Sequence, residues 1–143
     1  MASKPRSNVK KPTQRKASRK APNADLARGL ALRKQLNGRR WGKTSTPLVE
    51  AAPDLEVLVN EVLFGRIWSR GTIDLKMRSV AVIAALTATA QRPQLKNYIG
   101  NALNAGLTKA EIVEVLMQLV FYVGLPKVVN AISAAQEVFL EES

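Results

Sequence analysis

The fold is decided by residues 74–116, which read DLKMRSVAVIAALTATAQRPQLKNYIGNALNAGLTKAEIVEVL. Asp74 is well placed to cap a helix, and the run that follows it is apolar nearly all round as far as Ala90. No alternating pattern of the kind that marks a strand competes with this helical spacing. The first part of the stretch therefore predicts a helix that is buried on most of its faces.

The same stretch contains the signals for two further helices. Pro93 suits the first turn of a helix that ends at Gly106. Thr108 and Glu111 form a capping box, the clearest local signal in the chain, at the start of a helix that runs to Gly124. Three consecutive helices joined by short turns are expected here.

Two helices are predicted before this stretch and one after it. Asn23 can cap a helix over residues 24–37 with Gly38 at its end, and apolar residues at helical spacing give another from about Asp54 to Gly71. The segment between these two helices is basic and turn-rich.

Pro126 opens the last helix, with Glu137, Glu141 and Glu142 facing out. The sequence therefore predicts an all-α fold, a compact bundle of about six helices.

The positive charge of the chain is concentrated in its first residues. The net charge of the 143 residues is +11, and residues 1–24 contain eight Lys and Arg before the first acid, Asp25, so the remainder carries 11 − 8 = +3. This segment has almost no large apolar side chain that could offset its ordering entropy. We expect a basic disordered tail at residues 1–22 and one folded domain at residues 23–143.

Cysteine and histidine are both absent from the chain. The absence of cysteine excludes disulfides and thiolate chemistry, and the absence of histidine removes the commonest general base and metal ligand. We expect no metal site and no cofactor. Because the sequence has neither a long apolar run nor a secretory leader, we expect a cytoplasmic protein without membrane contact.

The helices expected at residues 74–90 and 108–124 have more apolar surface than one small bundle can hide. They are either a buried central pair or faces that pack against sister subunits. We favour a homo-oligomer, for which light scattering gives the molar mass.

Residues 68–139 resemble the carboxymuconolactone decarboxylase family over almost their whole length. The resemblance rests on the entry WSR…DLKMRS, the centre ALNAGLTKAEIVEVL and the close FYVGLPKVVNAISAAQEVF, and LARGLALRKQL…FGRIW extends it back to about Asp25. It implies an alkylhydroperoxidase-like helical fold that assembles into trimers or hexamers, with pockets between helices near subunit contacts. It also implies two chemistries, thiol-based peroxide reduction and decarboxylation of a lactone acid.

The residues of the peroxidase branch are missing. Its C-x-x-C-x-x-x-H motif falls on Gln91, Gln94 and Tyr98, and its acidic partner falls on Ser79. Without a thiol, the peroxidase mechanism is chemically excluded.

The decarboxylase branch is also altered. Its usual acid falls on Arg66 in FGRIW, and its usual histidines fall on Tyr98 and Gln118. Decarboxylation of a lactone needs a proton for the developing carbanion or enolate, and a tyrosine can deliver one only if a nearby charge lowers its pKa.

Five residues are the candidates for a site, each with a structural alternative. Tyr98 is the catalytic candidate and is otherwise a core residue. Arg66 and Arg78 could bind a carboxylate together with Arg70. Alternatively, Arg70 and Arg78 are ion-pair partners near Asp74 or solvated ends of helices. The remaining substrate-binding candidates are Gln118, which lines a pocket or ties two helices together, and Trp68, which is otherwise a packing residue.

Two functions follow from these residues. The first is a lyase that decarboxylates or otherwise processes a small organic acid or lactone in an interhelical pocket. The second is a catalytically degenerate oligomeric scaffold or ligand binder, whose tails at residues 1–22 contact nucleic acid or another polyanion. The tail could equally be a solubility extension or a targeting segment, since no folded nucleic-acid motif accompanies it.

Overall fold

The computed structural model describes residues 23–43 and 47–142, so the predicted tail at residues 1–22 lies outside the described residues. All the regular elements in these two ranges are helical, which confirms the all-α prediction. They are α1 (Ala24–Asn37), the 3-10 turn η1 (Gly38–Arg40), α2 (Pro47–Ala51), α3 (Pro53–Leu58), the π-helix η2 (Val59–Trp68), α4 (Leu75–Ala88), α5 (Arg92–Asn104), α6 (Lys109–Gln118), α7 (Val120–Val123) and α8 (Leu125–Glu141).

The helix ends follow the capping signals of the sequence. The side chain of Asn23 accepts from the backbone N–H of Asp25, and that of Asp74 accepts from Met77. Both bonds of the capping box between Thr108 and Glu111 are present. These local interactions explain why α1, α4 and α6 begin where the sequence predicted.

The division into elements differs from the prediction in three places. The expected helix from Asp54 begins at Pro53 as α3 and continues from Val59 as the π-helix η2. The expected helix after Thr108 is interrupted at Leu119, between α6 and α7. The short helix α2 was not predicted, because Pro47 stands at the end of a turn-rich segment of the sequence.

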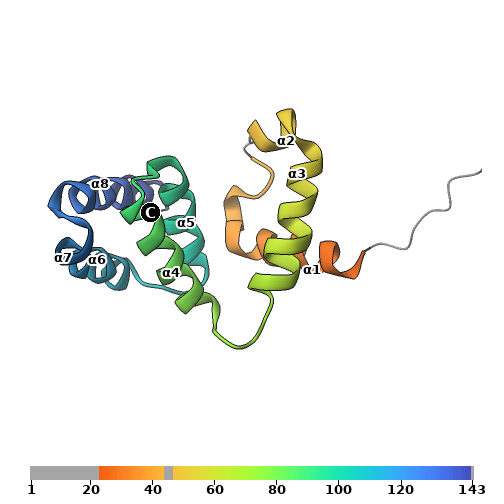
Figure 1. The fold of residues 1–143 in the computed structure, drawn as a ribbon, viewed down its shortest axis with the longest axis horizontal. Helices are drawn as coiled ribbons and strands as arrows, with labels where there is room; N and C mark the ends of the chain where they lie inside the picture. The colour runs from red at the N-terminus through yellow and green to blue at the C-terminus, as the bar shows by residue number, and fades with distance from the viewer. Residues whose placement is uncertain (1–22, 44–46, 143) are drawn as a thin grey trace, which may run out of the picture.

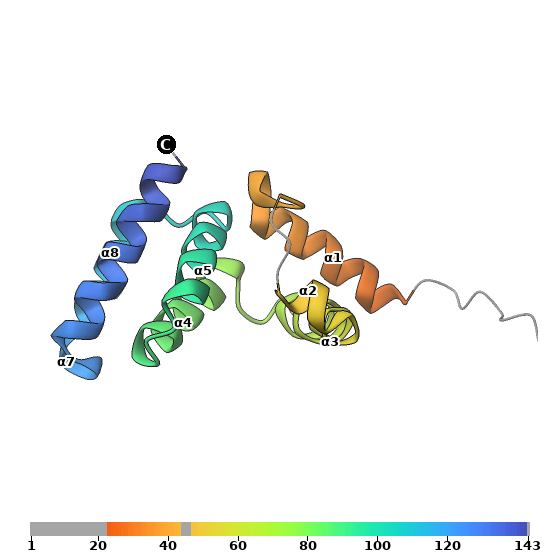
Figure 2. The same cartoon turned by 90° about the horizontal axis from the view of Figure 1, so that it is seen from above.

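The helices form two groups, α4–α8 on one side and α1–α3 with η2 on the other, joined by the segment after η2 (Figure 1, Figure 2). The larger core lies inside α4–α8. A smaller core of Leu36, Phe64 and Trp68 joins the groups, because Val82 of α4 and Tyr98 of α5 pack against it.

Most residues of α4 are at least half-buried in the single chain, as expected, but the fully buried ones are few. The buried residues of α4 are Ser79, Ile83 and Thr87, spaced by four along one stripe, and Met77 is 58% exposed. The apolar content of a helix sets how much surface it can bury, but the number of neighbours decides how much it does bury.

Helices α1 and η2 cross at two glycines. A Cβ on Gly29 would lie 2.8 Å from the backbone nitrogen of Gly65, and a Cβ on Gly65 would lie 2.7 Å from the carbonyl carbon of Asp25. Side chains are essentially never found so close to backbone atoms, so this crossing requires glycine on both helices.

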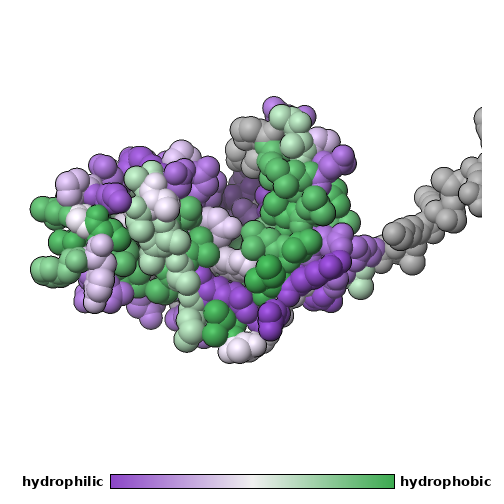
Figure 3. All heavy atoms as spheres, viewed as in Figure 1, coloured by the Kyte–Doolittle hydropathy of each residue, from purple (hydrophilic) through white to green (hydrophobic). Residues whose placement is uncertain are grey.

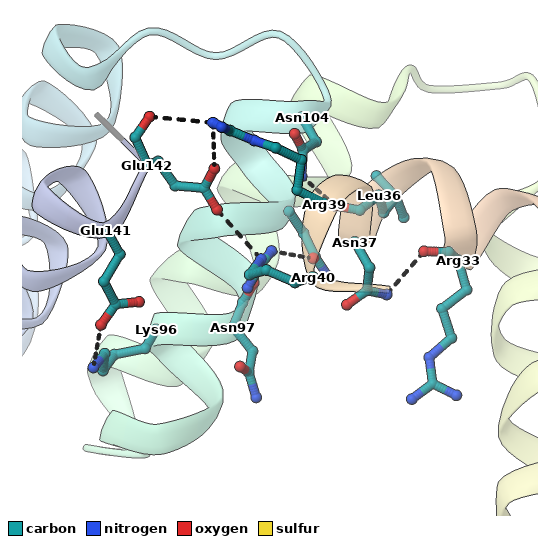
Figure 4. A network of polar contacts seen from close by, with 11 residues as sticks. Arg33, Leu36, Asn37, Arg39, Arg40, Lys96, Asn97, Asn104, Glu141 and Glu142 are labelled. Atoms are coloured by element: carbon teal, nitrogen blue, oxygen red, sulfur yellow. Dashed lines mark hydrogen bonds and ion pairs between the residues drawn. The ribbon is translucent and has the colours of Figure 1, made fainter. Parts of the chain in front are cut away.

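Arginines of η1 connect the first group of helices to α5 and α8 (Figure 4). Arg40 donates to Asn101 Oδ1 at 2.9 Å and pairs with Glu142, which Arg39 also contacts. Only 18% of the Glu142 side chain is exposed, so the prediction that it faces out was wrong. Asn104 adds a 2.8 Å bond to the carbonyl of Leu36.

Gly100 makes room for the Arg40 guanidinium, since a Cβ there would lie 2.5 Å from Arg40 Cζ. We expect Gly100→Ala to lower the free energy of unfolding by about 1–2 kcal/mol, despite the higher helix propensity of alanine, because Arg40 must leave its partners. In an Arg40→Met background the same change should be neutral or stabilising. Urea denaturation of the four proteins measures the difference, and equal losses in both backgrounds would contradict the explanation.

No helix in the described part of the chain is long and apolar enough to cross a membrane.

Candidate functional site

Three aromatic side chains from η2 and α5 form the centre of the candidate site, and we call Phe64, Trp68 and Tyr98 the aromatic cluster. The ring centroids of Phe64 and Trp68 lie 5.7 Å apart, and those of Trp68 and Tyr98 lie 5.9 Å apart, both in tilted arrangements. Phe64 and Trp68 are buried, and Tyr98 is half-buried. Two of the five candidate residues, Trp68 and Tyr98, are therefore in contact.

The environment of Tyr98 keeps its hydroxyl protonated. Burial raises the pKa of Tyr98, and the positive charge of Arg33 opposes this effect without cancelling it. Proton delivery by Tyr98 would require a lowered pKa, and the shift is in the opposite direction. A neutral phenol remains able to donate a hydrogen bond at every physiological pH.

We expect the titration of the Tyr98 phenol to lie above the ordinary tyrosine value of about 10. In ultraviolet difference spectra, Tyr98→Phe should remove the part of the phenolate signal that appears at higher pH. Because the unfolded chain loses this proton first, Tyr98 should also reduce stability as pH rises from about 10 through the folded-state pKa. A Tyr98 signal below pH 10 would contradict the assignment.

A half-buried polar group lies beside the aromatic cluster. Arg33 of α1 forms an ion pair with Glu56 of α3, donates to Asn60 Oδ1 at 3.0 Å and lies 5.7 Å from the centre of the Phe64 ring. Asn60 donates in turn to the backbone carbonyl of Glu56 at 2.8 Å, and Glu56 Oε2 is buried without a hydrogen-bond partner among the described residues. Sequence reasoning missed this group, because its members come from separate helices.

Arg78 lies on the side of α4 that faces the aromatic cluster. Leu75 and Val82, which share a helix face with position 78, both pack against the smaller core. The Arg78 side chain donates to the carbonyl of Arg70 at 2.8 Å, while its buried Nε has no partner in the described part of the chain. In the described residues, Arg78 forms no ion pair with Asp74, whose carboxylate caps α4.

Arg66 and Gln118 lie in other surroundings. Arg66 is half-exposed and pairs with Asp25, at 2.8 Å, and with Glu61. Gln118 is exposed and lines a pocket of about 480 Å³ between α4 and α6, which contains no member of the aromatic cluster. Of the two roles predicted for Gln118, its position favours lining a pocket over tying two helices together.

Two of the four positions matched to the peroxidase branch, Ser79 and Gln91, hold side chains with structural hydrogen bonds. The hydroxyl of buried Ser79 donates to the carbonyl of Leu75 at 2.7 Å, and Gln91 donates to the carbonyl of Thr89 at 3.3 Å.

Three known proteins are similar to this chain in sequence, and the names of two of them state a decarboxylase activity. A 15.0 kDa uncharacterized protein of Paracoccus denitrificans, encoded between nqo9 and nqo10, is 36% identical over 92 residues, covering 63% of this chain and 69% of the relative. The 4-carboxymuconolactone decarboxylase of Acinetobacter baylyi is 30% identical over 112 residues, or 78% of this chain and 84% of the enzyme. The nitrosuccinic acid decarboxylase npaB of Metarhizium robertsii is 26% identical over 113 residues, or 76% and 77%.

Residues 53–137 match the carboxymuconolactone decarboxylase family as a whole. This range covers η2, α4, α5 and α6 and most of α8, and so includes the aromatic cluster and Arg78. The resemblance inferred from the sequence is confirmed, and the chain belongs to the carboxymuconolactone decarboxylase family.

Proposed function

We propose that this protein decarboxylates a small organic acid beside the aromatic cluster, with Arg78 binding a carboxylate and Tyr98 donating a hydrogen bond to the reacting part of the molecule. Two relatives whose names state a decarboxylase activity support the reaction class. The observation that carries the proposal is the buried Nε of Arg78, which has no partner among the described residues and lies on a face that packs towards Trp68 and Tyr98.

An unpaired guanidinium N–H is a costly feature in a protein interior. A buried donor without an acceptor loses its hydration and gains nothing in return. A carboxylate is the anion that best satisfies a guanidinium group, through charge-assisted and often bidentate hydrogen bonds. Ligand binding therefore gives Arg78 a partner that the described part of the fold does not provide.

The proposed chemistry needs no redox group. The bond between the α-carbon and the departing carboxyl breaks, CO₂ leaves, and the electron pair stays on the α-carbon, delocalised onto a neighbouring carbonyl oxygen. Tyr98 stabilises that oxygen as a neutral hydrogen-bond donor, and water supplies the proton that forms a new C–H bond as the enolate collapses. Arg78 holds a carboxylate that remains on the product.

We propose further that a second copy of the chain completes the site. Tyr98 lines neither the pocket between α4 and α6 nor a further pocket between α4, α5 and α8. Large apolar side chains are exposed near α7, where Phe121 is 93% and Tyr122 is 82% exposed, and along α3 and η2 (Figure 3). Two different apolar surfaces on one chain favour a ring of copies joined head to tail. A monomeric mass by light scattering would contradict this part.

Turnover of 4-carboxymuconolactone, followed by release of CO₂, tests the proposed function. We expect Tyr98→Phe to lower kcat about 100-fold or more, since it removes one donor to the developing oxyanion. Arg78→Met should raise KM at least ten-fold. Lys34→Gln is the control at an exposed position of α1, outside the apolar surfaces near α7 and along α3 and η2, and should keep full activity.

Absence of turnover by the unmodified protein would overturn the proposal for this substrate. It would favour the scaffold or ligand-binding alternative, for which a gel shift with nucleic acid that disappears on deletion of residues 1–22 is the direct test. That shift should weaken steeply with salt, because binding would release counterions.

A further inference from the structure

A second pocket lies apart from the aromatic cluster, where the end of α4 meets the beginning of α5 and the first half of α8. Its volume is about 420 Å³, which is within the usual range for small-molecule sites. Leu95 provides part of an apolar wall, and no residue of the proposed decarboxylation site lines it.

The charged residues that line this pocket are both positive. Arg92 donates to the carbonyl of Asn130 at 2.7 Å and also contacts Ser133 Oγ and the carboxylate of Glu137. Lys127 donates to the carbonyl of Ala88 at 2.7 Å, at the end of α4. Since an ammonium group has three donors, Lys127 can bind a ligand while it keeps this bond. The pocket therefore favours an anion.

Thr87 provides a polar group that the described residues leave unsatisfied. Its side chain lines the pocket, only 1% of the residue is exposed, and its Oγ1 has no hydrogen-bond partner among them. A threonine in a helix can donate to a carbonyl one turn earlier, as exposed Thr89 at the C-cap of α4 does to Ala85 at 2.8 Å. Thr87 keeps its hydroxyl unpaired at a position where valine would have the same shape.

The pocket wall also contains a strained residue. Ala90 has φ +56°, in the left-handed region, and it occupies the position after the C-cap of α4 that usually holds glycine. The backbone bonds from Gln91 to Leu86 and from Ala90 to Thr87 complete this helix end. Alanine in this conformation costs free energy, and here it places a methyl group in the pocket wall.

We propose that this pocket is a second ligand site, which binds a small carboxylate that has an apolar portion. The carboxylate lies between Arg92 and Lys127 and accepts a hydrogen bond from Thr87, while the apolar portion packs against Leu95 and Ala90. A phosphate would satisfy the two cations but would leave the apolar wall without a partner.

Benzoate is the probe, titrated into the full chain and followed by amide NMR shifts. We expect the amides of Thr87, Ala90 and Asn130 to move together, with a Kd of order 1 mM. Benzamide has the same shape without the charge, and both it and inorganic phosphate should bind at least ten-fold more weakly. Saturation of these same amides by phosphate with equal affinity would overturn the carboxylate assignment, and no movement with benzoate would overturn the site.

Two variants locate the binding. Lys127→Met should weaken benzoate at least ten-fold. Thr87→Val should weaken it about five-fold while it raises the melting temperature, because it replaces an unpaired hydroxyl with a methyl group of the same size. Unchanged affinity in both variants would contradict the proposal even if the protein binds benzoate elsewhere.

The site is separable from the proposed decarboxylation. Tyr98→Phe should leave the benzoate response of Thr87 and Ala90 unchanged, whereas ligand at the aromatic cluster should move the Trp68 indole signal. Loss of the Thr87 response in Tyr98→Phe would show that benzoate reports on the aromatic cluster and would overturn the second site.

Discussion

Gly65→Ala is expected to lower the free energy of unfolding by about 3 kcal/mol, and the melting temperature by roughly 10 °C. Alanine is the better helix former by about 1 kcal/mol, so helix propensity alone predicts the opposite sign. The new methyl group would meet the backbone of Asp25 on α1, which cannot move aside as a flexible side chain can. The steric clash must win, either by separating α1 from η2 or by bending one of them.

Gly71→Ala is the matched control, because a Cβ at this position would meet no atom of the described residues within 4 Å and its φ is not in the left-handed region. It should be neutral or slightly stabilising. Gly29→Ala should repeat the loss seen with Gly65→Ala, since it probes the other side of the same crossing. Chemical denaturation monitored by tryptophan fluorescence gives all three values, and a neutral Gly65→Ala would show that α1 does not cross η2 this closely.

Arg33→Met is expected to cost about 2–3 kcal/mol, because it leaves Glu56 as a largely buried charge without its cation. The side chains of Arg33 and Glu56 are 19% and 16% exposed, so remaining water contact keeps the loss below that of a fully buried pair. Glu56 Oε2 already lacks a hydrogen-bond partner among the described residues, which leaves the carboxylate few other contacts.

The double variant Arg33→Met/Glu56→Leu should recover most of this loss, since replacing both partners removes the uncompensated charge. Denaturation of the wild type, both single variants and the double variant completes the cycle. If the losses simply add, the two side chains do not interact as the structure indicates.

Local signals were enough to predict most of the helices. Asn23, Asp74 and Thr108 cap helices through bonds to residues two or three positions away, so both partners stand close together in the sequence. The family resemblance could also be recognised in the sequence, and the match over residues 53–137 confirms the family. The subunit number and the catalytic role of Tyr98 remain predictions.

The sequence patterns could not predict contacts between residues that lie far apart in the chain. Arg33 and Glu56 are 23 positions apart, and their helices carry no motif that pairs them. Arg66 finds Asp25 in the same way, so the pairing of this guanidinium with two carboxylates was not foreseen. The pKa of Tyr98 depends on how far its ring is buried, and a helical pattern indicates a face without giving that depth.

The π-helix η2 has a consequence for how the protein responds to ligands. Asn60, Phe64 and Trp68 follow one another at intervals of four, so one short helix carries both the polar group around Arg33 and the aromatic cluster. A ligand that displaces Trp68 must therefore disturb the surroundings of Glu56. By thermodynamic linkage, formation of the ion pair between Arg33 and Glu56 and ligand occupancy beside Tyr98 change each other's equilibrium by the same factor, so a substitution far from the ligand can change its affinity.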